Sequence, residues 1–290
     1  MHRRTLLKTA LLGAAALTLR PALARSAREA DAEARLAALE RRHGGRLGVA
    51  ILDTGDGRRC GHRADERFLM CSTHKVLTVG AVLARVDQGA ERLDRRVVFG
   101  SDVVLSWAPV TSHRVGAPGM TVAELCEAAI TVSDNTADNL LLASLGGPAA
   151  VTAFARRLGD RLTRLDRIEP ALNVGADGDP RDTTTPHAML GDLRALLLGN
   201  VLSAASRDRL AAWMRATRTG LDKLRARLPG DWQAGDKTGS GAHDETNDIA
   251  IFWPPQRKPL LVTAYLAGST ADAAGRSAVL AEVGRIAASI

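Results

Sequence analysis

Ser72-Thr73-His74-Lys75 places a hydroxyl and an amine three residues apart, close to one turn of a helix. An amine in that position can accept the proton of the hydroxyl, which is typical of an activated serine nucleophile. A Ser and a Lys at this spacing are also a common solvent-exposed pair on a helix surface. These four residues alone therefore do not separate a catalytic role from an ordinary one.

Lysine is scarce in this chain, which has 34 Arg but only five Lys. Arg stays protonated at any accessible pH, whereas Lys can lose its proton when it is buried or lies beside another cation. A genome that favours Arg codons would also leave a few Lys by chance. The pairing of Ser72 with Lys75 gains weight because related motifs recur further along the chain.

The composition is that of an ordinary globular protein, with 290 residues and 46% hydrophobic content. This is enough for a substantial core in one large domain or two small ones. The formal net charge is +7, but residues 1–24 hold four basic residues and no acid, so the remainder carries about +3. Like charges form no block and aromatic residues are few, so we do not expect nucleic acid as a partner.

Residues 1–24 have the order of a secretory signal peptide with a twin arginine. Arg3 and Arg4 precede the apolar run Leu11–Leu19, and Ala22-Leu23-Ala24 has the small-x-small pattern of a cleavage site. The apolar run is about half the roughly 20 residues that cross a bilayer. We expect a periplasmic or secreted protein, exported folded by the twin-arginine pathway, without stable membrane association. A surface helix with basic flanks is the alternative.

Strand patterns lie near both ends of the chain, and helical patterns fill the middle. We expect strands at residues 46–53, 58–63, 231–238, 247–253 and 260–267, and helices at 27–42, 72–87, 121–130, 135–145, 148–158, 186–198, 204–215 and 271–290. The predicted fold is α/β plus all-α, with one antiparallel sheet flanked by the terminal helices and an inserted all-helical domain.

The predicted division follows from this pattern. Residues 25–67 and 217–290 would form a discontinuous α/β domain, and residues 68–216 an all-α domain. Catalytic residues would lie at the seam between them, where ligand pockets commonly form. Residues 165–186 form a long connection without a regular pattern, which we interpret as functional.

The chain has an odd number of cysteines, namely Cys60, Cys71 and Cys126, so we expect no essential disulfide.

Three further motifs follow the first in order: Ser133-Asp134-Asn135, Glu169-Pro170-Ala171-Leu172-Asn173 and Lys237-Thr238-Gly239. Ser-x-x-Lys, Ser-Asp-Asn and Lys-Thr-Gly together form the signature of class A β-lactamases and penicillin-binding proteins. The chain resembles a class A serine β-lactamase over essentially its whole mature length, including Trp107–Val110 and Arg181–Pro186. Its twin-arginine signal and Lys237–Gly241 look like the extended-spectrum cephalosporinase branch. The resemblance implies a three-layer fold of the β-lactamase/transpeptidase type.

The resemblance also implies an acylation step at Ser72. Lys75 or Glu169, acting through a water, would take the proton of Ser72, and the resemblance leaves both alternatives open. Ser133 would give a proton to the lactam nitrogen, helped by Lys237 and Lys75. The backbone N–H groups of Ser72 and Ser240 would stabilise the oxyanion. A structural alternative for Ser133 and for Asp134 is to cap the following helix.

Deacylation would depend on Glu169, which with Asn173 would hold the water that releases the acyl group. The two residues are four apart, so on a single turn both side chains would face the same way. By resemblance, Arg167 and Asp182 would close the loop that carries Glu169. The alternative for these two is a surface ion pair of little energetic value.

Substrate binding would follow from charge, since β-lactams carry a carboxylate beside the ring. By resemblance, Lys237 and the segment Thr238-Gly239-Ser240 would bind that carboxylate. Thr246-Asn247-Asp248 stands where many members of the family have an Arg, so Arg276 is the predicted substitute, with Lys223 as a second candidate. Asn135 would bind the acylamido side chain, and Trp107 would either form a wall of the cleft or belong to the core.

Two residues depart from the family pattern. His74 stands where a bulky apolar residue, commonly Phe, is usual, and it is either a packed neutral imidazole or a positive charge near Lys75. Carbapenem-hydrolysing relatives pair the cysteine at position 71 with one just after Lys-Thr-Gly. Here Gly241 stands at that second position, so this disulfide is impossible.

The expected activity is hydrolysis of penicillins and cephalosporins by a monomer, with a small-molecule β-lactam as the partner. A penicillin-binding D,D-peptidase and a non-hydrolysing β-lactam sensor use the same nucleophile, but they lack an efficient deacylating base. We expect no metal and no cofactor, because the seven His show no clustered spacing such as His-x-His-x-Asp.

Overall fold

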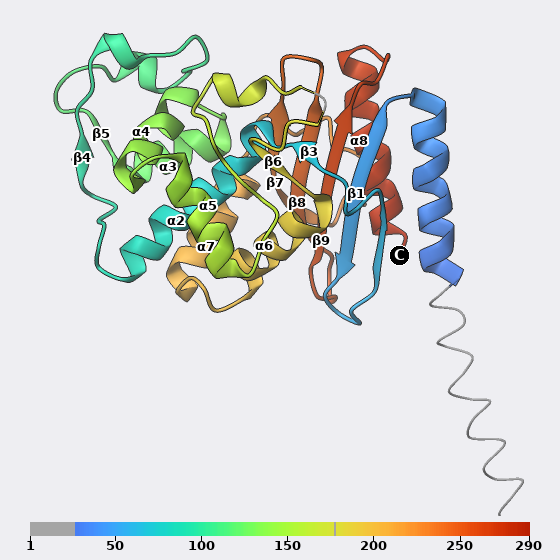
Figure 1. Ribbon diagram of the computed structural model, residues 1–290. Coiled ribbons are helices and arrows are strands. Elements are labelled where there is room, and N and C mark those ends of the chain that lie inside the picture. The colour runs from blue at the N-terminus through green and yellow to red at the C-terminus, as the bar shows by residue number, and fades with distance from the viewer. Residues whose placement is uncertain (1–26, 177) are drawn as a thin grey trace, which may run out of the picture.

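The computed structural model describes residues 27–176 and 178–290, in which a five-stranded sheet lies beside a group of helices (Figure 1). The strand order is β2-β1-β9-β8-β7, and all neighbours are antiparallel. The strands are β1 (Arg46–Asp53), β2 (Arg59–His62), β7 (Gln233–Ser240), β8 (Thr246–Trp253) and β9 (Leu260–Ala267). The predicted sheet built from both ends of the chain is confirmed.

Strand β1, near the start of the described chain, pairs with β9, near its end. They pair along their whole length, from Arg46 opposite Ala267 to Asp53 opposite Leu260, and almost every residue in both is buried. The helix over residues 27–43 and α8 (Ala273–Ala288) cover one face of the sheet, and α6 (Pro186–Leu198) packs on β1 and β9 from the other (Figure 1). Burial on both faces explains why these strands read as apolar runs.

Apolar side chains form two cores, one on each side of the sheet. Leu36, Leu47, Phe252 and Val279 belong to the core beneath the terminal helices. The larger core lies between the sheet and the remaining helices. Two cores separated by one sheet make the predicted three-layer arrangement.

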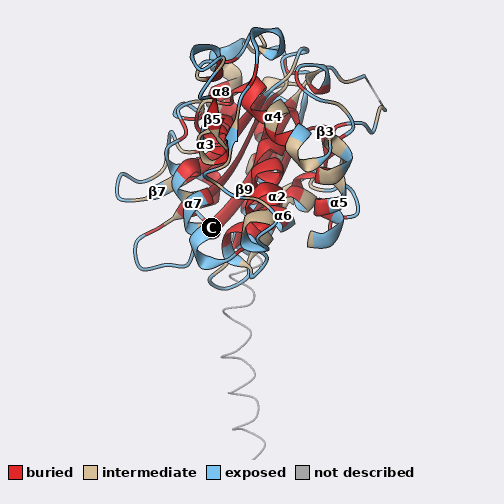
Figure 2. Cartoon of the chain, turned by 90° about the vertical axis from the view of Figure 1, so that its left-hand side faces the viewer, coloured by how far each residue is buried: buried red, intermediate tan, exposed pale blue. Residues whose placement is uncertain are grey.

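Helix α2 (Lys75–Asp87) runs through the middle of the helical part. Every residue from Lys75 to Ala84 is buried, and Figure 2 shows this helix in the interior of the molecule. The helices around it are α3 (Val122–Thr131), α4 (Asn135–Leu145), α5 (Pro148–Leu158) and α7 (Ala204–Arg215). Helix α3 begins at a capping box, in which Thr121 and Glu124 each bond the backbone N–H of the other.

The structure differs from the predicted helix at residues 72–87. A 3-10 helix, η1 (Cys71–His74), comes first, and α2 begins only at Lys75. Cys71 has a φ of +47°, in the left-handed region that a residue with a side chain rarely adopts, and the three residues after it belong to the 3-10 turn and not to the α-helix. The long connection at residues 165–186 also contains short elements, η4 (Ala171–Asn173) and β6 (Thr183–Thr184).

Short segments complete the fold. Strand β6 pairs with β3 (Phe68–Leu69), and β4 (Arg96–Val97) pairs with β5 (Met120–Thr121). Two further 3-10 helices are η2 (Ser101–Val103) and η3 (Thr111–His113). The domain limits predicted at residues 67/68 and 216/217 fall just before β3 and just after α7. The division itself stays a prediction.

The three cysteines all lie within the described residues, where each is buried and free. The predicted signal peptide, residues 1–24, lies outside the described residues. Within those residues, no helix combines the length and apolar character needed to cross a membrane.

Candidate active site

The Ser72 motif lies at the floor of a cleft of about 290 Å³ between the helical part and the edge strand β7. The cleft is lined by Ser72, Trp107, Ser133, Asn135, Asn173, Thr219, Lys223, Thr238, Gly239 and Ser240. Residues from all four sequence motifs therefore meet at one place. The η1 turn presents Ser72, directly after the strained Cys71 and just before α2.

Lys75 is the centre of the polar contacts in the cleft. Its Nζ lies 3.1 Å from Ser72 Oγ and 3.0 Å from Glu169 Oε1. The same nitrogen donates to the Ser133 carbonyl at 3.0 Å and to Asn135 Oδ1 at 2.6 Å, and the Lys75 side chain is fully buried. Lys75 therefore contacts the nucleophile, a carboxylate and the second serine at once, which excludes the solvated surface pair.

Glu169 is the second group beside the nucleophile. Ser72 Oγ donates to its Oε1 at 3.2 Å, and Asn173 Nδ2 donates to its Oε2 at 2.5 Å. The backbone of Glu169 is fixed by Asn139 on α4, which accepts from its N–H at 3.0 Å and donates to its carbonyl at 2.9 Å. This role of Asn139 was not predicted from the sequence. Its place four residues after Asn135, on the same helix face, was the available signal.

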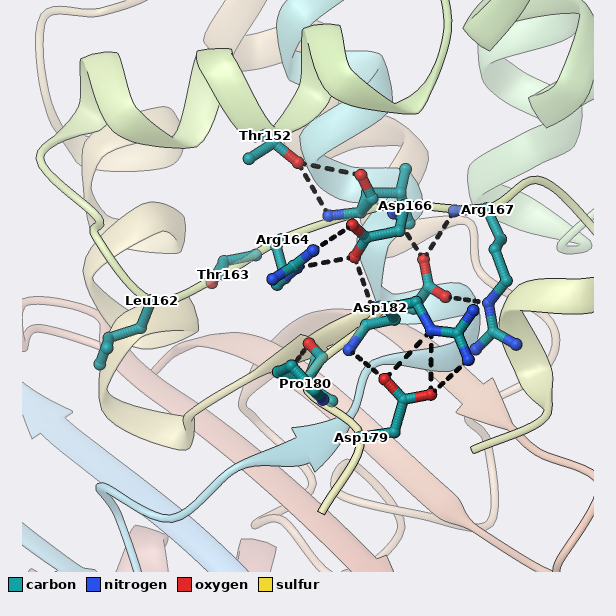
Figure 3. A network of polar contacts seen from close by, with 12 residues as sticks. Thr152, Leu162, Thr163, Arg164, Asp166, Arg167, Asp179, Pro180 and Asp182 are labelled. Carbon is teal, nitrogen blue, oxygen red and sulfur yellow. Dashed lines mark hydrogen bonds and ion pairs between the residues drawn. The ribbon is translucent and has the colours of Figure 1, made fainter. Parts of the chain in front are cut away.

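The loop that carries Glu169 is closed by Arg167 and Asp182, as predicted (Figure 3). The Asp182 carboxylate is fully buried and accepts from the N–H groups of Asp166 at 2.7 Å and Arg167 at 2.9 Å. It also pairs with Arg167 Nε at 2.5 Å. A buried carboxylate with three donors from the opposite side of the loop is a structural tie, so the alternative of a surface ion pair is wrong.

Ser133 lies opposite Ser72 across Lys75. Its backbone has a φ of +58°, and its Oγ lies 3.0 Å from Lys237 Nζ and 3.3 Å from Lys75 Nζ. Burial, and then the positive charge of Lys75, lowers the pKa of Lys237 to about 7. Two lysine amines on one hydroxyl form a route for protons to Ser133. The helix cap is Asp134 alone, whose Oδ1 accepts from the N–H of Ala137.

Strand β7 brings Thr238, Gly239 and Ser240 to the cleft. A Cβ on Gly239 would lie 2.8 Å from the Met70 carbonyl oxygen, so only glycine lets the strand approach the η1 turn this closely. Ser72 and Ser240, whose N–H groups are the predicted oxyanion donors, both line the cleft.

The structure does not bring Arg276 into the cleft lining. Its three guanidinium nitrogens donate to Asp244 Oδ1 at 2.8 Å, Thr246 Oγ1 at 3.2 Å and the Ala271 carbonyl at 2.7 Å. Lys223, the second candidate, does line the cleft, and its Nζ lies 2.8 Å from the exposed carboxylate of Asp222. Arg276 is therefore held by the β7–β8 turn and the segment that leads into α8. Contacts of this kind form only in the folded protein and are not visible in the sequence.

Trp107 and Asn135 form the opposite wall. The Trp107 side chain is half exposed, lines the cleft and donates from Nε1 to the Val132 carbonyl at 3.1 Å, so it is not a core aromatic. The Asn135 N–H donates to the Trp107 carbonyl at 3.0 Å. Thr219 was not predicted from the sequence, and its Oγ1 lies 2.6 Å from Thr238 Oγ1.

These side chains supply what acyl transfer requires: a buried serine, an amine and a carboxylate in contact with it, and a proton donor on the other side. The carboxylate is also held by an amide that could orient a water molecule. The fold and the site therefore define a serine enzyme of the acyl-transfer class.

Comparisons with known proteins agree. A family model described as the beta-lactamase enzyme family matches residues 31–290. Beta-lactamase OXY-1 of Klebsiella oxytoca is 46% identical over 280 residues, 96% of each chain, and beta-lactamase CTX-M-8 of Citrobacter amalonaticus is 48% identical over 256 residues, 88% of each chain. The solved ancestral (GNCA) class A β-lactamase has a TM-score of 0.86 at 62% identity, covering 88% of this chain and 98% of that chain. The chain belongs to the β-lactamase enzyme family, class A.

Proposed function

We propose that this protein opens the β-lactam ring of penicillins and cephalosporins through an acyl-enzyme on Ser72 and so confers resistance to these antibiotics. One observation carries the proposal beyond family membership. Ser72 Oγ lies 3.1 Å from Lys75 Nζ and 3.2 Å from Glu169 Oε1, while Asn173 holds the other oxygen of the same carboxylate. The nucleophile and the group that can activate water therefore share one pocket.

In the acylation step, Ser72 Oγ attacks the lactam carbonyl carbon and its proton passes to Lys75 or Glu169. The C–N bond of the ring then breaks, and the nitrogen takes a proton from Ser133 Oγ. Lys237 and Lys75 replace that proton across contacts of 3.0 and 3.3 Å. Because the pKa of Lys237 is about 7, this amine exchanges protons readily near neutral pH.

In the deacylation step, a water molecule between Glu169 and Asn173 gives a proton to Glu169 and attacks the ester carbonyl. Ser72 leaves with a proton returned from the same base. A positioned general base contributes about 10² to 10⁴ in rate. The ties of Glu169 to Asn139 and of Arg167 to Asp182 support this role because they fix the carboxylate on its loop.

The substrate carboxylate binds beside strand β7. Lys237, Thr238 and Ser240 offer an ammonium and two hydroxyls there, and Lys223 adds a second positive charge to the same cleft. The Asn135 amide receives the acylamido group, and Trp107 covers the cleft from the far side. Lys223 is proposed in place of Arg276 because Lys223 lines the cleft, whereas Arg276 lies outside the lining and pairs with Asp244.

Export and assembly belong to the same proposal. The twin-arginine pattern and cleavage site of residues 1–24 support export of a folded protein to the periplasm or beyond. We propose further that the protein acts there as a monomer without stable membrane association.

The test compares the wild type with Ser72→Ala on a chromogenic cephalosporin and a penicillin. Sustained turnover by the wild type and none by Ser72→Ala is the expected result. Labelling of the wild type that stops at one equivalent, without turnover, would identify a D,D-peptidase or a sensor instead. Release of D-alanine from a stem peptide by the labelled site would then distinguish the peptidase.

A further inference from the structure

His74 and Asp138 form a contact that the reaction described above does not use. His74 Nε2 lies 2.9 Å from Asp138 Oδ2, and both side chains are fully buried. His74 belongs to the η1 turn that presents Ser72, whereas Asp138 belongs to α4. The contact therefore links the nucleophile turn to another helix.

The partners of His74 determine where its protons are. Its Nδ1 lies 2.8 Å from the Cys71 carbonyl oxygen, which can only accept, so Nδ1 carries a hydrogen. Burial opposes charge on both His74 and Asp138, but their mutual attraction and hydrogen bond outweigh it. The pKa of His74 is raised and the pKa of Asp138 is lowered. Both directions favour an imidazolium that donates to a carboxylate.

The charges around this pair come from several elements. Lys75 at the start of α2 and Glu169 on its loop both act on His74 electrostatically, with opposite signs. Asp138 also feels the charge of Lys75. The pair itself adds no net charge beside the catalytic groups, so its effect there is mainly geometric.

One face of α4 holds three parts of the site. Asn135, Asp138 and Asn139 are spaced three and four residues apart, which places them on the same side of the helix. Asn135 accepts from Lys75, Asp138 pairs with His74, and Asn139 brackets the backbone of Glu169. Helix α4 is therefore the common support of Lys75, the nucleophile turn and the deacylating residue.

We propose that the buried His74–Asp138 ion pair positions Ser72 for acylation. By donating to the Cys71 carbonyl, His74 supports a residue whose φ of +47° is unfavourable, and Asp138 fixes the imidazole to α4. His74 is thus a positioning residue that acts through the Cys71 backbone and does not touch the substrate. The inference rests on the proposed hydrolase function and extends it to this pair.

The predicted effect is confined to one chemical step. Glu169 and Asn173 are held through Asn139 and the Arg167–Asp182 tie, not through His74. Loss of the pair should therefore slow acylation more than deacylation. A general loss of folding would instead reduce the number of active sites.

The kinetic test contrasts two substitutions at the same position. Asp138→Ala removes the partner of His74, whereas Asp138→Asn keeps an amide that can donate to the Nε2 of a neutral imidazole. We expect Asp138→Ala and His74→Phe to lower the acylation rate constant by about 10- to 100-fold. Asp138→Asn should stay within about threefold of the wild type, because a neutral hydrogen bond replaces the ion pair. All rates are normalised to active sites titrated with a slowly released β-lactam.

A matched control comes from His187, whose Nδ1 lies 3.0 Å from Asp65 Oδ1 on the surface and which does not line the cleft. His187→Phe should leave acylation unchanged. Wild-type acylation by Asp138→Ala and His74→Phe would overturn the proposal, as would equal slowing of acylation and deacylation.

A direct reading of the pair needs no substrate. In protein labelled with ¹⁵N-histidine, both ring nitrogens of His74 should carry protons at neutral pH, with the signals assigned by their loss in His74→Phe. A single protonated nitrogen would overturn the ion pair. Failure of β-lactam turnover in the wild type would refute the hydrolase function but leave this measurement intact, so the two failures are distinguishable.

Discussion

Asp182→Asn is the substitution that most sharply tests how the Glu169 loop is held. The amide oxygen of the new Asn can still accept from the backbone N–H groups of Asp166 and Arg167, which now bond one carboxylate oxygen at 2.7 and 2.9 Å. The other oxygen, 2.5 Å from Arg167 Nε, becomes an NH₂ group that faces another donor. The ion pair is therefore lost while the shape of the side chain is kept.

The magnitude follows from burial. Breaking a fully buried ion pair costs about 3–5 kcal/mol. The Arg167 side chain is 22% exposed and partly solvated, while Asp182 is fully buried, so about 2–3 kcal/mol is expected here. For a chain of 290 residues, with an unfolding entropy of about 2.1 cal/mol/K per residue, this corresponds to a fall in melting temperature on the order of 3 to 5 °C. The loosened loop should also slow deacylation, because Glu169 would no longer hold its water in place.

The assay combines thermal unfolding with single-turnover measurement of acylation and deacylation. Asp179→Asn is the matched control, because its partner Arg181, on the same loop, has a side chain that is about half exposed. The control should keep the melting temperature and both rates of the wild type. The account of the loop is refuted if Asp182→Asn melts within a degree or so of the wild type and deacylates at the same rate.

Three other predictions follow from single contacts. Gly239→Ala should lower kcat/KM by at least about 10-fold in steady-state assays, because its Cβ would meet the Met70 carbonyl at 2.8 Å and push β7 from the Ser72 turn. Lys223→Ala should raise KM for anionic β-lactams by about 10-fold, whereas Arg276→Ala should leave it near the wild-type value; the reverse order would restore Arg276 as the carboxylate cation. Asp192→Asn should stabilise the protein increasingly as pH rises. Burial, and then the charge of Asp160, raises the pKa of Asp192 well above its usual value, so the folded state favours the neutral acid and loses stability as pH rises through that pKa. Melting curves from pH 5 to 8 test this, and a constant difference from the wild type would contradict it.

The sequence predicted most of the fold because its signals are local. Helix α4 begins at Asn135 behind the Asp134 cap and ends before Gly146, and β1 begins and ends at the predicted residues. The start of α2 was misplaced because residues 71–74 form a 3-10 turn with a positive φ at Cys71, packed closely against β7, and no local pattern signals this. Periodicity cannot detect a backbone strain imposed from elsewhere in the fold.

The residues of the candidate site also fall into two groups, those with a local sequence signal and those whose role depends on distant contacts. Ser72, Lys75 and Ser133 could be chosen from short motifs, and the structure brings them together. Asn139 had only the signal of its place on the same helix face as Asn135. Thr219 and the pairing of His74 with Asp138 had none, because their partners are distant in the sequence. Arg276 lies outside the cleft lining for a related reason: its guanidinium pairs with Asp244, which folding brings beside it, and its binding of the substrate carboxylate stays a prediction.

The central claim is that Glu169 releases the acyl group from Ser72, and Glu169→Ala tests it most directly. After mixing with a cephalosporin, intact-protein and peptide mass spectrometry should show one acyl group per molecule on the peptide that contains Ser72, with turnover slowed by about 10² to 10⁴. Ser72→Ala should carry no adduct. Wild-type turnover by Glu169→Ala, with no accumulated acyl-enzyme, would contradict the account.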